Sequence, residues 1–174
     1  MTTDEWADPQ VLHRVHLLLT RMLAELDRVC RQLGVSYAVY GGTAIGAVRH
    51  KGFIPWDDDG DVCMPREDFD VMMTRDDYER FLAEAPSLLG EELRVDNTRT
   101  MRDYPFMFSK LVLKGTLLIP EFAKDSTYRM PISLDILPVD NLPDSPRAFR
   151  AMSRCTWLWG RLLFLRGTPR PYLI

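Results

Sequence analysis

The chain contains 174 residues, of which 46% are hydrophobic and 27% are charged, and its formal net charge at pH 7 is -3. This length and composition suit one globular domain with a substantial core and exclude a largely disordered chain. The acidic balance argues against nucleic acid as a partner, and no run reaches the ~20 apolar residues of a membrane-spanning helix.

The distribution of charge and the cysteine content indicate the compartment in which the protein is expected. Residues 145–174 hold six of the 22 basic residues and none of the 25 acidic ones, which leaves a net charge of -9 on residues 1–144. Cys30, Cys63 and Cys155 are odd in number and form no C-x-x-C pattern, which favours a reducing compartment over a disulfide framework. Because the N-terminus also lacks an apolar signal core, we expect a cytoplasmic protein.

The first predicted element is a long amphipathic helix over residues 9–34. Pro9 suits its first position, apolar residues recur at helical spacing, and Gly34 ends it. A short strand over 37–40 then leads into a pair of glycines, after which Thr43 is expected to cap a second helix, TAIGAVRH. A strand, a glycine pair and a helix in succession form a place where phosphate can bind.

The remaining elements mix strands and helices without long βαβ repeats. We predict a helix over 75–85 and a final helix over 146–165, with a turn at Lys114-Gly115. The predicted strands cover residues 62–64, 92–95, 106–112, 115–119 and 134–137. The pattern indicates an α+β fold, or α/β with a mixed sheet, over residues 1–145, followed by a separate basic helical segment over 146–174.

The acidic stretch WDDDGDV contains a D-x-D pair, Asp59 and Asp61, at the start of a predicted strand. Such a cluster is unfavourable unless cations or hydrogen-bond donors balance it, although a solvated acidic turn is the simpler alternative. The pattern occurs twice, because DGDVCMPRE (59–67) and DFDVMMTRD (68–76) agree in five of nine positions. The second copy offers Asp68 and Asp70 as an alternative pair, and we favour the first.

A third carboxylate, Asp135, lies alone in a later apolar strand. A D-x-D on a strand directs two carboxylates to one face, and an Asp on an adjacent strand can complete an oxygen-rich site of the kind that suits Mg²⁺. Gly41 and Gly42 at a helix start would let phosphate approach the backbone. Each signal alone has an ordinary explanation, a turn for the glycines and an Arg partner for Asp135.

The segment YGGTAIGAVRHKGFIPWDDDGDVCMPRED resembles the signature of the LicD family, and LDILPVDNLPD resembles a later block of that family. This resemblance, from about Tyr37 to Asp144, implies a polymerase-β-like nucleotidyltransferase fold and a CDP-activated donor. It further implies that Gly41, Gly42 and Thr43 hold the donor phosphates. Asp59, Asp61 and Asp135 would then be the catalytic, metal-binding carboxylates, with Mg²⁺ or Mn²⁺ as the cofactor.

Several residues near these motifs are candidates for phosphate binding or proton transfer. Arg49 and Lys51 follow the glycine-led helix and are candidate phosphate ligands, with solvated loop cations as the alternative. Asp135 could accept the proton of the attacking hydroxyl. Lys110 lies in a strand-like run and could face the active site, but alternation alone does not fix its side of the sheet.

The expected function is transfer of phosphorylcholine or a related phospho-alcohol to a sugar hydroxyl of a surface glycan, such as teichoic acid or lipopolysaccharide, or of its lipid-linked precursor. The alternatives are a nucleotidyltransferase that adds NMP to a small molecule and a truncated, non-catalytic domain, since family members commonly continue further. The basic, aromatic helix over 146–165 either contacts an anionic membrane at its inner face or packs against protein.

Overall fold

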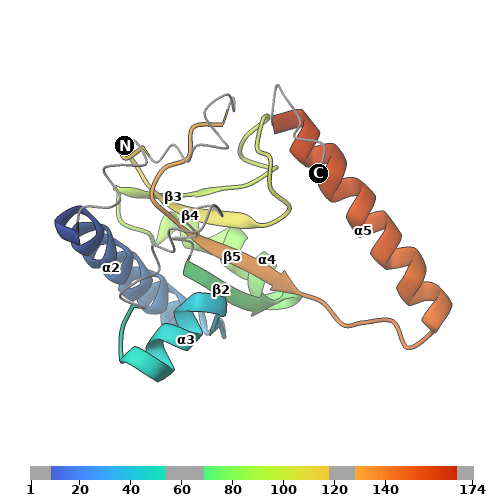
Figure 1. Ribbon diagram of the computed structural model, residues 1–174, viewed down its shortest axis with the longest axis horizontal. Coiled ribbons are helices and arrows are strands. Elements are labelled where there is room, and N and C mark those ends of the chain that lie inside the picture. The colour runs from blue at the N-terminus through green and yellow to red at the C-terminus, as the bar shows by residue number, and fades with distance from the viewer. Residues whose placement is uncertain (1–8, 54–68, 118–127, 168–174) are drawn as a thin grey trace.

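The computed structural model describes residues 9–53, 69–117 and 128–167. Its centre is one five-stranded sheet with the order β1-β2-β5-β4-β3 (Figure 1). The strands are β1 (Ala38–Tyr40), β2 (Phe69–Thr74), β3 (Leu93–Asp96), β4 (Ser109–Leu113) and β5 (Ser133–Val139). Strands β2 and β5 are parallel and the other three pairings are antiparallel, so the sheet is mixed and the expected α+β class is confirmed.

Helices α2 (Pro9–Leu33) and α4 (Arg75–Glu84) both contact β5, the central strand of this sheet. The apolar stripe of α2, including the fully buried Leu26 and Val29, packs in one cluster with Val71, Leu111 and Ile136 of the central strands. Burial of a large aliphatic side chain contributes about 1.5–3 kcal/mol, so this stripe supplies much of the stabilisation of the fold.

Helix α4 begins directly after Thr74, whose side chain caps it. The Thr74 hydroxyl accepts a hydrogen bond from the Asp77 backbone N–H at 3.3 Å, which satisfies one of the free amides of the first turn. A short 3-10 helix, η1 (Ala85–Ser87), continues the chain with Pro86 inside it. The helix predicted over 75–85 is therefore confirmed.

Two local predictions are wrong. Helix α3 (Gly41–His50) begins at the glycine pair, with Tyr40 at the N-cap position and no side-chain cap, so Thr43 lies within its first turn instead of capping it. The glycines enter the helix themselves, and Gly41 has a φ of 57° that suits glycine.

The second error concerns the strand predicted over 115–119. Residues 114–115 form the expected turn, with Gly115 at φ 77°, but the chain then continues without strand pairing through Leu117, the last described residue before the gap. The strand predicted over 106–112 also begins later, at Ser109, because pairing with β5 starts there. Before it, Phe106 packs with Tyr104 and Tyr128 in a small second cluster.

The last described element, α5 (Pro146–Gly167), lies apart from the sheet after an extended connection (Figure 1). Gly160 of this helix lies close to Met107, because a Cβ added at Gly160 would be 2.9 Å from the Met107 sulfur. Within the described ranges, no helix combines the length and the apolar character needed to cross a membrane.

Candidate active site

Five directly paired positions form one row across all five strands. In sheet order the row is Tyr40, Asp70, Asp135, Lys110 and Asp96. Directly paired positions of neighbouring strands share one face of a sheet, and neighbouring strands lie about 4.8 Å apart. The topology therefore gathers three acidic positions and one lysine into a short line.

The centre of the row is a buried ion pair. Lys110 on β4 donates from Nζ to Oδ1 of Asp135 on β5, and the two residues are only 1% and 3% exposed. The ammonium also lies 4.9 Å from the ring centroid of Phe106 and 5.5 Å from that of Phe108. A buried charge requires a partner, and here an opposite charge and two aromatic faces surround the lysine.

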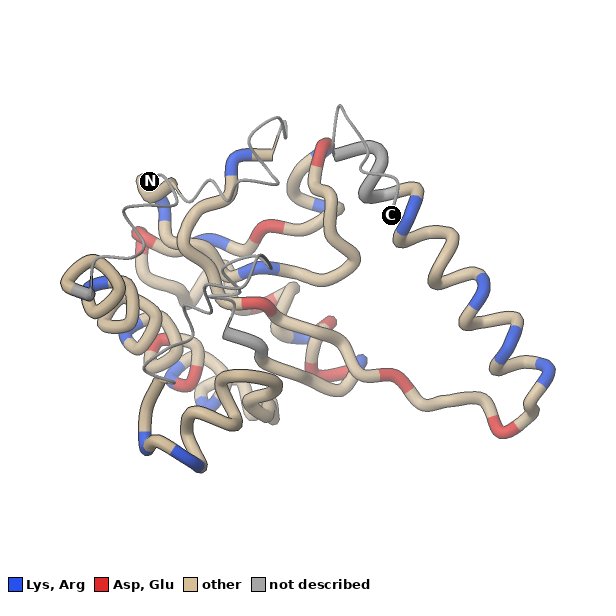
Figure 2. Tube along the Cα trace, viewed as in Figure 1, with Lys and Arg blue, Asp and Glu red and all other residues tan. Residues whose placement is uncertain are grey.

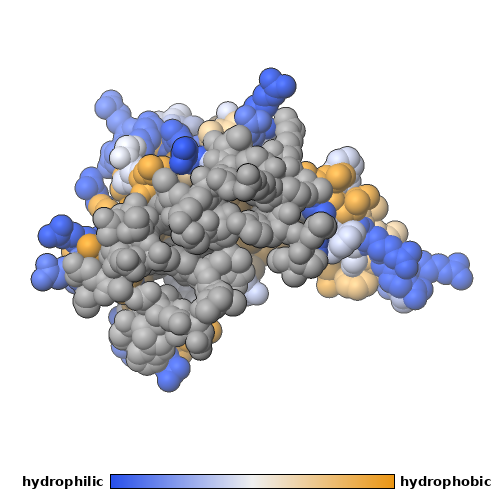
Figure 3. Space-filling view, turned by 45° about the horizontal axis from the view of Figure 1, so that its top comes forward, coloured by the Kyte–Doolittle hydropathy of each residue, from blue (hydrophilic) through white to orange (hydrophobic). Residues whose placement is uncertain are grey.

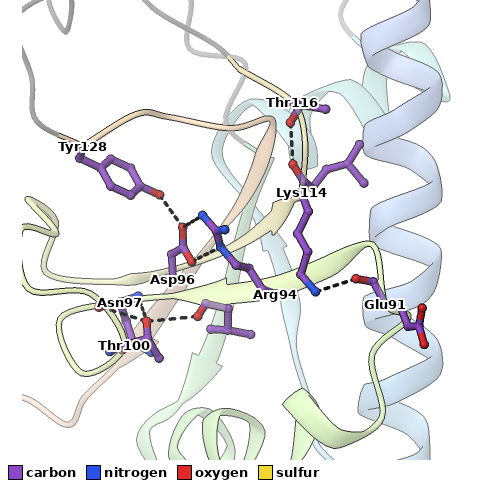
Figure 4. Close-up of polar contacts among 10 residues, drawn as sticks. Glu91, Arg94, Asp96, Asn97, Thr100, Lys114, Thr116 and Tyr128 are labelled. Atoms are coloured by element: carbon purple, nitrogen blue, oxygen red, sulfur yellow. Dashed lines mark hydrogen bonds and ion pairs between the residues drawn. The ribbon is translucent and has the colours of Figure 1, made fainter.

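The outer carboxylate of the row, Asp96, is neutralised separately. Arg94 reaches its two oxygens at 2.7 and 3.0 Å, and the Tyr128 hydroxyl donates to Oδ2 at 3.1 Å (Figure 4). Burial, and then the nearby Asp96 charge, raise the pKa of Tyr128 well above its ordinary value, so the phenol stays protonated and donates. Asp96 is thus a structural anion, held by two donors and buried at 1% exposure.

Helix α3 starts immediately after the first position of the row. Its N-terminal glycines, Gly41 and Gly42, follow Tyr40 directly, so free backbone N–H groups and the positive end of the helix dipole lie at this edge of the sheet. Tyr40 is two strand spacings, roughly 10 Å, from Asp135. The binding of donor phosphates at the start of α3 stays a prediction.

The structure does not place the two candidate cations beside the glycine pair. Arg49 lies in the last turn of α3 and Lys51 at its C-cap, whereas the glycines form the first turn. A helix of 10 residues is about 15 Å long, so the backbones of these groups are separated by most of that length. Their part in phosphate binding stays a prediction.

The carboxylates of the expected metal site are only partly described. Asp59 and Asp61 lie outside the described residues, as does the strand predicted over 62–64. The second copy of the repeat supplies β2, whose Asp70 backbone is paired with Asp135. Among the residues whose side chains are described, no three His, Cys, Asp or Glu residues gather closely enough to hold a metal ion.

Sequence reasoning raised Lys110 as a residue that could face the active site without fixing its side of the sheet, and it did not single out Asp96 or Tyr128. A lysine within the apolar run SKLVL was the available signal for Lys110, because a charged residue in a buried strand needs a partner. Neither Asp96 nor Tyr128 lies in a pattern that predicts their contact, since 32 residues separate them along the chain.

Comparison with known proteins gives the site a family context. The family model described as "LicD/FKTN/FKRP, nucleotidyltransferase domain" matches residues 34–110, which include the glycine pair, both D-x-D copies and Lys110. The chain is 31% identical over 136 residues to the lipopolysaccharide cholinephosphotransferase LicD of Haemophilus influenzae, a match that covers 78% of this chain and 47% of that protein.

Two shorter matches are to uncharacterized proteins of Rickettsia prowazekii and Rickettsia typhi. Each is 36% identical over 52 residues, which cover 30% of this chain and 20% and 17% of those proteins. No solved structure matches the chain. The chain thus spans about half the length of the Haemophilus relative and a smaller share of the other two. The signature residues, the family model that matches residues 34–110 and the alignment over 136 residues agree, and over these segments the chain is similar to the LicD family.

Proposed function

We propose that this chain carries the catalytic domain of a phosphotransferase that moves phosphorylcholine, or a related phospho-alcohol, from a CDP-activated donor to a sugar hydroxyl of a surface glycan. The observation that supports this most directly is the position of Asp70 in the sheet. It pairs with Asp135 on β5 and, on its other side, with Tyr40 on β1, the residue directly before α3. The Haemophilus relative is a lipopolysaccharide cholinephosphotransferase, which supports phosphorylcholine as the transferred group and lipopolysaccharide as the class of acceptor.

The proposed carboxylates have the chemistry that a hard divalent cation requires. Carboxylate oxygens are the ligands that Mg²⁺ prefers, and Mg²⁺ commonly shares its shell with substrate phosphates. We assign Asp135 as one ligand, with either Asp59 and Asp61 or the second-copy pair, Asp68 and Asp70, as the others. When bound, Mg²⁺ or Mn²⁺ would neutralise phosphate charge and orient the donor.

The protein groups would supply binding and proton transfer. The amides of Gly41, Gly42 and Thr43 would bind the donor phosphates at the N-terminus of α3. The acceptor oxygen would then form a bond to phosphorus while the bond from phosphorus to the CMP oxygen breaks, and the hydroxyl proton would pass to a carboxylate, for which Asp135 is our candidate. In this scheme positioning and charge neutralisation provide most of the rate enhancement.

The test combines ligand binding with product analysis. We expect CDP-choline with Mg²⁺ to raise the thermal midpoint of the chain, because a ligand that binds the native state stabilises it by mass action. Asp135→Asn should abolish this shift, whereas Asp103→Asn, a change at an exposed loop carboxylate, should preserve it. Asp59→Asn, Asp61→Asn and Asp70→Asn then identify the working D-x-D copy.

Product analysis separates the proposal from its rivals. Release of CMP together with a phosphorylated glycan is the expected result. Pyrophosphate release from a nucleoside triphosphate would instead indicate nucleotidyl transfer. The absence of any shift with CDP-choline, CDP-ribitol and CDP-glycerol would indicate a non-catalytic domain.

We also propose that α5 contacts an anionic membrane surface, where lipid-linked acceptors would be found. Arg147, Arg150, Arg154 and Arg161 lie on this helix without any acidic residue, and Figure 2 shows basic positions spaced along it. Hydrophobic side chains accompany them, and Figure 3 shows these beside hydrophilic ones on the helix that projects from the body. Basic amphipathic helices bind anionic lipid through both kinds of contact.

The exposed tryptophans provide the test of this contact. Trp157 and Trp159 are 64% and 61% exposed, so alanine at both positions should leave the fold intact and weaken binding to phosphatidylglycerol vesicles in a sedimentation assay. Vesicles of phosphatidylcholine alone should bind poorly because they lack the negative charge. Equal binding to both kinds of vesicle, or to neither, would contradict the proposal.

A further inference from the structure

We propose that Tyr104 is an acceptor-binding residue, whose phenolic hydroxyl donates a hydrogen bond to the sugar hydroxyl that attacks the donor. The inference rests on the proposed function, because it assumes transfer to a sugar with Asp135 as the proton acceptor. The observation behind it is that the Tyr104 hydroxyl is buried and has no hydrogen-bond partner among the described residues.

Tyr104 packs between two side chains that contact the row. Its ring meets those of Phe106 and Tyr128 edge-to-face, with centroids 5.5 and 5.2 Å apart. Phe106 flanks the Lys110 ammonium, and the Tyr128 hydroxyl bonds the Asp96 carboxylate (Figure 4). Tyr104 therefore lies on the same face of the sheet as the row.

The unpaired hydroxyl sets Tyr104 apart from the two other buried tyrosines of the described ranges. The Tyr78 hydroxyl lies 2.7 Å from the Ser109 hydroxyl, and that of Tyr128 donates to Asp96 at 3.1 Å. Buried polar groups without a partner are uncommon because the lost hydration is not replaced. A bound ligand that accepts a hydrogen bond would remove this penalty.

The surroundings of the hydroxyl select the kind of ligand. Burial raises the pKa of the Tyr104 phenol, and the nearby Tyr128 and Asp135 raise it further, so the group stays protonated and is a donor. Asp135 is an acceptor, and its bond with Lys110 uses only part of the capacity of a carboxylate. A sugar hydroxyl both accepts and donates hydrogen bonds, so it matches this pair. An anionic phosphate without a bridging cation would face the carboxylate as a like charge.

An acceptor can reach this hydroxyl after the rotation of neighbouring side chains. Tyr104 is 1% exposed, but Met101 and Phe106, which pack against its cluster, are only partly buried. Changes of side-chain rotamer are common when binding surfaces are occupied. We therefore place the entrance for the acceptor at Met101 and Phe106.

The experiment is the substitution Tyr104→Phe, which removes the hydroxyl and keeps the ring. Transfer is measured from CDP-choline to lipopolysaccharide that lacks phosphorylcholine. We expect kcat/KM for lipopolysaccharide to fall by about tenfold, the loss expected for one hydrogen bond to the attacking group. The rise in thermal midpoint with CDP-choline and Mg²⁺ should be unchanged. The urea midpoint should equal or exceed that of the unmodified chain, because no hydrogen bond of the fold is lost.

Tyr78→Phe is the matched control. Tyr78 is also buried, but its partner Ser109 directly precedes Lys110 in β4 and so faces the side of the sheet opposite to the row. This variant should have a lower urea midpoint and an unchanged kcat/KM for lipopolysaccharide.

The outcomes separate this inference from the function on which it rests. No transfer by the unmodified chain would overturn both. Unchanged transfer kinetics in Tyr104→Phe would overturn the inference alone, and so would loss of the CDP-choline shift, because the hydroxyl would then act on the donor. A Tyr104→Phe variant that is less stable or does not fold would assign the hydroxyl a structural role, as through a buried water, and would overturn it too.

Discussion

Replacement of Lys110 by Met should destabilise the protein far more than the loss of a typical surface ion pair. Lys110 and Asp135 are 1% and 3% exposed, and Met retains most of the apolar stem of the lysine while leaving the Asp135 carboxylate buried without this cation. Removal of one partner from a buried pair costs about 3–5 kcal/mol, whereas an exposed pair contributes about 0–1 kcal/mol. We therefore expect the free energy of unfolding to fall by about 3–5 kcal/mol.

The assay is urea unfolding followed by circular dichroism, applied to a double-mutant cycle of Lys110→Met, Asp135→Leu and the combined variant. The combined variant removes both charges, so it should be much more stable than the sum of the two single losses predicts. Arg75→Met is the matched control, because Arg75 and its partner Asp140 are 45% and 52% exposed, and its loss should cost less than ~1 kcal/mol.

Two results would refute the reasoning about this pair. A loss below ~1 kcal/mol for Lys110→Met would mean that the Asp135 carboxylate is solvated or otherwise compensated without the lysine. Additive single losses would mean that the two side chains do not stabilise one another. Either result would also remove the basis for treating the ammonium as a fixed cation of the site.

Three further predictions concern other parts of the fold. Thr74→Ala removes the cap of α4 and should lower the free energy of unfolding by about 0.5–2 kcal/mol in urea titration, and Thr74→Ser should restore most of it. The hydrogen bond from Arg28 holds the pKa of Glu25 below its ordinary value of 4.5. The ionised Glu25 therefore stabilises the folded protein above that pH, and this stabilisation is lost as the pH falls through the folded-state pKa. The difference in free energy of unfolding between the protein and Glu25→Gln should shrink on acidification, and a constant difference would contradict this. Burial raises the pKa of the Cys30 thiol to about 12, so iodoacetamide at pH 8 should label the exposed Cys155 and spare Cys30, as peptide mapping would show.

The helices were predictable because their signals are local. Pro9 and Gly34 bracket a long stripe of apolar residues, and the structure confirms a helix over Pro9–Leu33. The β5 strand was also predictable from its apolar run, and the placement of Asp135 within it is confirmed. In these segments the spacing of side chains and the end signals agree, so no distant contact is needed to decide the structure.

The site was less predictable because its geometry depends on pairing between distant segments. The two copies of the D-x-D-V-x-M-x-R repeat carry nearly the same local signal, and nothing in that signal predicts that the copy containing Asp70 pairs in parallel with β5. Likewise, the contact of Lys110 with Asp135 follows from the antiparallel register of β4 and β5, which no spacing within either strand encodes.

The strand order has a consequence for how the chain reaches its native state during synthesis. Strand β5 joins β2 to β4 at the centre of the sheet, yet of the strands in the described ranges it is the last to leave the ribosome. Until Ser133–Val139 is available, the described part of the sheet consists of two separate antiparallel units, β1 with β2 and β3 with β4. Each unit then presents the strand edge that β5 will occupy, and unpaired edges promote aggregation. A nascent chain stalled before Ser133 is therefore expected to depend on chaperones, whereas completion of one seven-residue strand closes both edges together.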